Sequence, residues 1–192
     1  MLCIPKKKYA LAEVPYRDAW EGRKENLGDE HKETLLSLQC LGRALYSQEK
    51  YALAETTYRD AWASHKQTLG EKHEETLLCL HRLGNALYSQ KKYVLAEATY
   101  RDAWKGRMQT LGEMHEQTLF SLHCLGHALY CQRKYAQAEK TYRGAWEGRK
   151  KALGEFHKDT LQSLVDLRDA LKKTSPFFNG KNQPRRKLPQ RP

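Results

Sequence analysis

Apolar residues recur along this chain at helical spacing, in pairs of segments separated by short polar stretches. In one segment, leucines follow one another at intervals of three or four residues, at Leu77, Leu80, Leu83 and Leu87. The next segment, 93–104, places tyrosine, alanine and tryptophan at the same intervals. Because such spacing aligns apolar side chains on one side of an α-helix, each pair of segments predicts two amphipathic helices.

The same pattern returns every 42 residues. Four tryptophans keep this spacing, at Trp20, Trp62, Trp104 and Trp146. Four histidines in the polar stretches keep it as well, at His31, His73, His115 and His157. Segments 50–91 and 92–133 are identical at 28 of 42 positions. A fixed period of this length indicates a stacked array in which each unit buries its apolar face against its neighbours.

Boundary residues give the register of the helices. Gly70 and Gly112 each follow the last apolar residue of a segment, where helices commonly end on a residue with positive φ. The next histidine precedes a helix, so we expect each of the four repeated histidines to pin the loop or cap that helix. The register predicts an array over 8–173. It begins with an unpaired first helix over 8–27 and ends with a terminal helix over 159–173. Between them lie three helix pairs, over 33–69 (33–48 with 51–69), 75–111 (75–90 with 93–111) and 117–153 (117–132 with 135–153).

The two ends of the array differ from its interior. Pro15 lies inside the first predicted helix, and we expect it to break or kink that helix or to set its start. In the last helix Arg168 and Lys172 replace the glycine and the tyrosine of the repeat, as expected of a polar terminal cap. Residues 1–7 and the basic tail 174–192 are predicted to be disordered. The unpaired first helix fits a piece of a longer array, and a short complete protein is the alternative.

The motif LxxLGxALYSQxKYxLAExxYRDAW resembles a tetratricopeptide repeat. The added LGxxHxxTL segment and the 42-residue period resemble the longer repeats of kinesin light chains and nephrocystin-3-type proteins, and the resemblance covers about residues 8–173. It implies an all-α, right-handed superhelical solenoid of antiparallel helix pairs, about eight helices in all. In the family, the first helix of each pair lines a concave groove that holds an extended or helical peptide.

Carried over to this chain, the groove positions are polar or aromatic residues, most of which differ between units. They are Gln39, Arg43 and Tyr46 in the first pair, His81, Asn85 and Tyr88 in the second, and His123, His127 and Tyr130 in the third. None of them is acidic, so the groove suits a short peptide that carries carboxylates and an apolar anchor. The resemblance therefore implies a protein–protein interaction adaptor or scaffold.

The third pair also contains a pattern that could bind a metal ion. His123, His127 and Cys131 are spaced by four residues on one helix face, and the two histidines could bind one zinc ion. The equivalent residues of the other units are polar and variable, as expected of a groove lining, so we favour the groove and predict neither a metal site nor a cofactor. The chain carries no catalytic motif, and we predict that it is not an enzyme.

The net charge of +11 is concentrated near the C-terminus. Residues 134–175 carry +4 and the tail 176–192 carries +5, whereas the central units are nearly neutral. The alternative hypothesis is therefore binding of nucleic acid or another polyanion through this basic end, with a steep salt dependence. We favour the adaptor, because helical repeats that bind RNA carry a residue code in each repeat that we do not find in these units.

Cysteine usage and hydropathy indicate the compartment. The five cysteines are odd in number and out of register with the repeat, which favours reduced thiols. No apolar run is long enough to cross a membrane or to act as a signal peptide. We expect a cytoplasmic protein that has a protein or peptide partner and does not contact a membrane.

Overall fold

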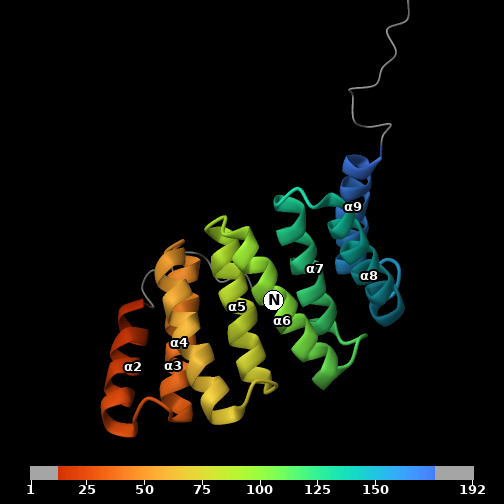
Figure 1. The fold of residues 1–192 in the computed structure, drawn as a ribbon. Coiled ribbons are helices and arrows are strands. Elements are labelled where there is room, and N and C mark those ends of the chain that lie inside the picture. Colours follow the sequence, from red (N-terminus) through yellow and green to blue (C-terminus); the bar gives the residue numbers. More distant parts are fainter. Residues whose placement is uncertain (1–12, 176–192) are drawn as a thin grey trace, which may run out of the picture.

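The computed structural model describes residues 13–175, and every regular element in that range is an α-helix (Figure 1). The helices are α2 Glu13–Leu27, α3 Lys32–Ser47, α4 Tyr51–Leu69, α5 Glu74–Ser89, α6 Tyr93–Leu111, α7 Glu116–Cys131, α8 Tyr135–Leu153 and α9 Lys158–Thr174. Our predictions for residues 1–12 and 176–192, including the start of the first helix and nearly all of the basic tail, lie outside the described residues.

Each helix packs against the next one along the chain, so α3 pairs with α4, α5 with α6 and α7 with α8. Short turns join the helices, and each pair stacks on the one before it to form an extended row from α2 to α9 (Figure 1). The predicted all-α solenoid of stacked helix pairs is confirmed. Because neighbours in the row are neighbours in sequence, the buried leucines and alanines form a continuous core along the array.

A tyrosine packed on a glycine brings the two helices of each pair close together. A Cβ atom added to Gly84 would lie 2.7 Å from Cε1 of Tyr100, and one added to Gly126 would lie 2.6 Å from the same atom of Tyr142. Both tyrosine rings are almost fully buried. The glycine of the repeat is therefore required by the close approach of the tyrosine ring, rather than by backbone conformation.

The four repeated histidines cap helices. In each, Nδ1 accepts a hydrogen bond from the backbone N–H two residues later, as His73 does from Glu75 at 3.2 Å. Three residues earlier, Gly70 ends the preceding helix with a φ of 91°. The predicted capping role of these histidines is confirmed, and the cap satisfies a backbone donor that would otherwise lack a partner in the helix.

A polar ladder ties each unit to the previous one. The Glu97 carboxylate in α6 accepts hydrogen bonds from Gln132 and Lys134, in the turn between α7 and α8, and from Arg101. Burial alone would raise the pKa of Glu97, but these donors lower it to about 2. Glu55 in α4 accepts the equivalent bonds from Gln90 and Lys92, so the same contact recurs one unit earlier.

The end helices depart from the interior. Pro15 is the third residue of the described part of α2, which runs from Glu13 to Leu27. In α9, Arg168 is exposed, as expected of a cap, but so are Leu161 and Leu164. The equivalent leucines of α7 face glycines of α8, and in α9 the described part of the chain offers them no such neighbour.

Candidate functional site

One side of α3, α5 and α7 carries three of the eight positions at which these helices differ, including the one position where all three residues are different. Their spacing of three or four residues places them on one helix face, which we name the variable face. Its members are Leu36, Gln39, Arg43 and Tyr46 of α3, Leu78, His81, Asn85 and Tyr88 of α5, and Phe120, His123, His127 and Tyr130 of α7. Nine of these twelve are the groove residues predicted from the sequence.

The structure divides the predicted residues by exposure. Gln39, His81 and His123 are only 4%, 4% and 6% exposed, and each contacts a side chain of another helix. Arg43 is exposed and Asn85 is half-buried. Gln39, His81 and His123 therefore join neighbouring units. The accessible polar part of the face consists of Arg43, Asn85 and His127.

Two of the three tyrosines of the face contact the next unit, and the third contacts the second helix of its own pair. Tyr46 Oη lies 3.0 Å from Ser89 Oγ, and Tyr88 Oη lies 3.2 Å from Cys131 Sγ. The ring of Tyr130 packs edge-on against Tyr135. All three tyrosines remain half-buried, so part of each ring is available to a partner.

Sequence reasoning missed the apolar members of the face. Leu36 and Phe120 are 48% and 45% exposed, respectively, although large apolar side chains are usually buried. They lie seven residues, close to two helical turns, before Arg43 and His127, and this spacing was the signal that could have identified them. The variable face thus combines exposed apolar side chains with polar groups.

An arginine in the second helix of a unit bonds to a serine in the following helix. Arg107 donates to Ser121 Oγ at 2.7 Å, and Arg149 donates to Ser163 Oγ at the same distance. In the joint between α4 and α5, His65 and Cys79 occupy these two positions. A thiol is a poor acceptor for a buried guanidinium, so the absence of arginine at position 65 is compatible with a cysteine at position 79.

A pocket of about 390 Å³ lies beside His65, where the repeat has the longer arginine. Its lining includes Leu35, Leu36, Gln39, His65, Leu69 and Glu75. The Gln39 amide donates to Glu75 at 2.9 Å, and its oxygen accepts from Arg82 at 2.7 Å. His65 is buried, its Nδ1 has no partner in the described part of the chain, and burial lowers its pKa. The pocket therefore combines leucine side chains with polar groups, and its lining also includes the charged residues Glu30, Lys32 and Glu75.

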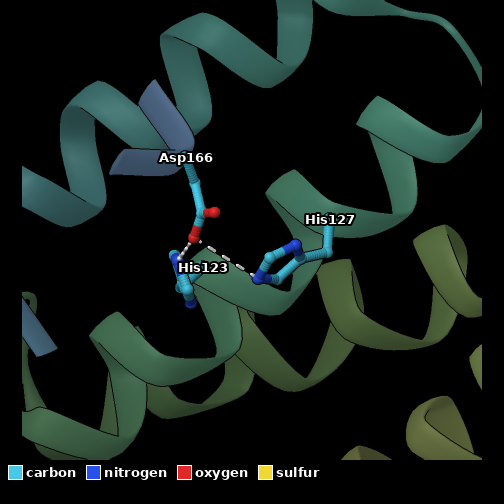
Figure 2. A group of neighbouring side chains, drawn as sticks. All are labelled: His123, His127 and Asp166. Carbon is cyan, nitrogen blue, oxygen red and sulfur yellow. Dashed lines mark hydrogen bonds and ion pairs between the residues drawn. The ribbon is translucent and has the colours of Figure 1, made fainter. Parts of the chain in front are cut away.

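At the other end of the array, α7 and α9 bring together His123, His127 and Asp166 (Figure 2). The Asp166 Oδ2 atom lies 2.8 Å from His123 Nε2 and 3.6 Å from His127 Nε2. The sequence pattern grouped the two histidines with Cys131, but Cys131 contacts Tyr88 instead. Asp166 was missed because it lies on a helix 39 or more residues away in sequence.

The remaining conspicuous residues have structural roles. The four tryptophans are half-buried, and Lys24, Lys66 and Lys150 each lie over the ring of one of them. The cysteines of the described residues are free thiols. Within residues 13–175, no helix is both long and apolar enough to cross a membrane.

Comparisons with known proteins identify the family to which this repeat architecture belongs. Models of the tetratricopeptide repeat family match residues 34–108 and 118–159. The fold is similar to the crystal structure of a point-substituted Podosopora anserina kinesin light chain with nearly identical TPR-like repeats, at 21% identity and a TM-score of 0.78, covering 88% of this chain and 82% of that one. The corresponding structure without that substitution has a TM-score of 0.77 at the same identity and coverage.

A further similar structure is BtubC (BKLC) from P. vanneervenii, at 18% identity and a TM-score of 0.74, covering 86% of this chain and 66% of that one. No curated protein sequence matches the chain. The two family matches together span more than half of the 192 residues. The chain therefore belongs to the tetratricopeptide repeat family of protein-interaction scaffolds, with repeats like those of the kinesin light chain structures.

Proposed function

We propose that this array is an adaptor that binds a short peptide along the variable face, and that the peptide carries carboxylates and an apolar anchor. The observation that carries the proposal is where the units differ. Their tyrosine, glycine and capping histidine positions are constant, whereas Arg43, Asn85 and His127 change at one accessible position. A surface that varies on a constant scaffold is the part that can discriminate between partners.

The chemistry of the face supports the peptide class. None of its twelve residues is acidic, and Arg43 is an exposed guanidinium that can bond a carboxylate through two N–H groups. Exposed Leu36 borders the 390 Å³ pocket, which is wide enough for an apolar side chain of the peptide. The proposal thus combines an apolar anchor near α3 with polar recognition along α3, α5 and α7.

The structure weakens the alternative of polyanion binding through the basic end. Of the ten basic residues from Lys134 to Lys173, five form ion pairs: Lys134, Arg143, Lys150, Arg168 and Lys172. Arg149 is buried against Ser163. Pairing and burial reduce the charge that these residues offer to phosphate groups, and we therefore favour the adaptor.

The test is selection from a peptide display library with the full-length protein at physiological salt. We expect acidic peptides with one apolar residue to be enriched. A variant with Arg43→Ala, Asn85→Ala and His127→Ala should lose them, and Arg43→Ala alone should weaken binding about tenfold, since a hydrogen bond to a charged group contributes about 1.5 kcal/mol.

The matched control changes exposed residues of the second helices, Asp60→Ala and Asp102→Ala, and should bind as the wild type does. Peptides that bind the face variant equally well would place recognition elsewhere. Binding that is lost steeply between low and physiological salt, with polyphosphate as an effective competitor, would favour the polyanion alternative.

A further inference from the structure

The cluster of His123, His127 and Asp166 joins α7 to the terminal helix α9, and all three side chains are of types that bind metal ions. Two imidazole nitrogens come from adjacent turns of α7, and one carboxylate oxygen comes from α9 (Figure 2). We propose that these three side chains bind a divalent transition-metal ion such as zinc, and that the ion fastens the terminal helix α9 to the third helix pair. The proposal does not rest on the peptide-binding function.

The spacing of the three ligand atoms fits one ion. They lie within 4.8 Å of one another, and the two nearest pairs, both to Asp166 Oδ2, are 2.8 and 3.6 Å apart. Ligand atoms about 2.0–2.1 Å from a tetrahedral zinc ion lie roughly 3.3 Å from each other. The two Asp166 distances lie within about 0.5 Å of that spacing, and the two imidazole nitrogens, at most 4.8 Å apart, would approach each other by up to about 1.5 Å when the ion replaces the His123 hydrogen bond.

Outer hydrogen bonds orient two of the three ligands. His127 Nδ1 lies 3.0 Å from the Tyr142 hydroxyl, which leaves Nε2 directed to Asp166. The Gln162 amide donates to both oxygens of Asp166, at 3.2 and 3.3 Å. Partners of this kind hold a metal-binding imidazole in one tautomer and a carboxylate in one orientation. With the ion bound, His127 Nδ1–H would donate to the tyrosine oxygen.

Two neighbouring groups could interfere with metal binding, one through its charge and one as a competing ligand. Arg149 is the nearby cation that opposes a metal ion, but its guanidinium is held by Ser163 and the Asp159 carbonyl. The thiol of Cys124 stays protonated because burial raises its pKa to about 12.

The cluster is specific to this end of the array. At the position of His127 the earlier units have Arg43 and Asn85, and at the position of Asp166 they have Arg82 and Cys124. Among the described residues, no other group of three such side chains lies as close together. Three protein ligands would leave one position of a tetrahedral ion for water or a partner's carboxylate. His127, whose side chain is 37% exposed, would give access from the variable face.

The experiment titrates zinc into the full-length protein after chelator treatment, under reducing conditions, and follows heat and thermal stability. We expect binding that saturates at one ion per chain and raises the melting temperature. Cobalt should bind at the same site and show the absorption of tetrahedral cobalt without the charge-transfer band of a thiolate ligand.

Variants separate this site from adventitious binding. His127→Asn restores the amide found at Asn85, which accepts a hydrogen bond from the equivalent tyrosine, so it should fold normally. It and Asp166→Asn should weaken zinc binding at least about 100-fold, and Tyr142→Phe should weaken it about tenfold as expected for an outer-shell partner. The matched controls Tyr100→Phe and Cys131→Ser should leave zinc affinity unchanged.

Three results would contradict the proposed metal site. Zinc affinity that is the same in the folded His127→Asn variant and the wild type would overturn the proposal, as would a thiolate band that disappears in Cys131→Ser. An absence of saturable zinc or cobalt binding in the wild type would also overturn it, and would leave the cluster as a hydrogen-bonded contact between α7 and α9.

Discussion

The α4–α5 joint and the α8–α9 joint use the same positions of the repeat for different chemistry. The first holds His65, Cys79, Gln39 and Arg82, and the second holds Arg149, Ser163, His123 and Asp166 at the equivalent positions. In the first joint the pair of His65 and Cys79 leaves a pocket. In the second, a buried guanidinium bonds to serine beside a histidine–carboxylate cluster.

The helix packing beside these two joints is the same. In both places a tyrosine packs on a glycine of the preceding helix and a histidine caps the next helix. The comparison teaches that packing and capping residues determine where the helices lie, and that a few side chains between units determine what each joint can bind. Changing the constant residues should thus have equal effects in both places, and changing the variable ones should not.

The largest effect is expected where the constant packing is broken. Gly42→Ala and Gly126→Ala would each place a methyl group 2.6 Å from the ring of a buried tyrosine, Tyr58 or Tyr142. We expect each to lower the free energy of unfolding by about 2 kcal/mol, since overpacking costs up to about 3 kcal/mol and alanine returns about 1 kcal/mol of helix propensity. Urea denaturation measures both values.

The control is Gly144→Ala, where the new methyl group would lie 3.5 Å from the nearest heavy atom, Leu122 Cδ2, an ordinary contact. It should be neutral or stabilise the fold by up to about 1 kcal/mol. A similar loss in all three variants would mean that the tyrosine contact is not what makes glycine necessary.

A smaller effect is expected when the arginine–serine pair of the α8–α9 joint is replaced by the histidine–cysteine pair of the α4–α5 joint. Arg149→His alone would leave the Ser163 hydroxyl and the Asp159 carbonyl without their donor and should destabilise the protein by about 1.5 kcal/mol. Adding Ser163→Cys should recover part of that loss, because it recreates the pair of His65 and Cys79. A double-mutant cycle measures the coupling, for which we expect about 0.5–1 kcal/mol.

The reverse exchange, which places the arginine–serine pair in the α4–α5 joint, tests the same comparison. His65→Arg with Cys79→Ser should restore the arginine–serine bond and fill the pocket of the α4–α5 joint. We then expect unchanged or higher stability together with weaker binding of peptides that use an apolar anchor. Additive effects in both cycles would show that the two residues of each pair do not depend on each other.

The smallest effect is expected at the caps. His73→Ala and His157→Ala each remove one acceptor for a backbone N–H, at 3.2 and 3.3 Å. Each should cost about 0.5–1 kcal/mol, as for other N-cap side chains. The losses in free energy of unfolding, measured by denaturation, should agree within about 0.5 kcal/mol. A clear difference would show that the histidine cap does not stabilise both joints equally.

Much of the fold could be predicted from residues that repeat. Leu77 to Leu87 and Tyr93 to Trp104 specify two helices by their spacing, and the 42-residue period specifies their stacking. The site was less predictable. Spacing placed Arg43 and Asn85 on one face, but it could not reveal that Gln39 bonds to Glu75 and Arg82 of the next unit.

The sequence by itself determined the helices, their order and their caps, because these depend on side chains within a few residues of one another. Only the tertiary structure decided that His123 and His127 meet Asp166 rather than Cys131, and that His65 borders a pocket. Those outcomes depend on distances between helices that are about 40 residues apart in sequence. Helical periodicity describes one helix at a time, whereas contacts between units depend on how the helices pack.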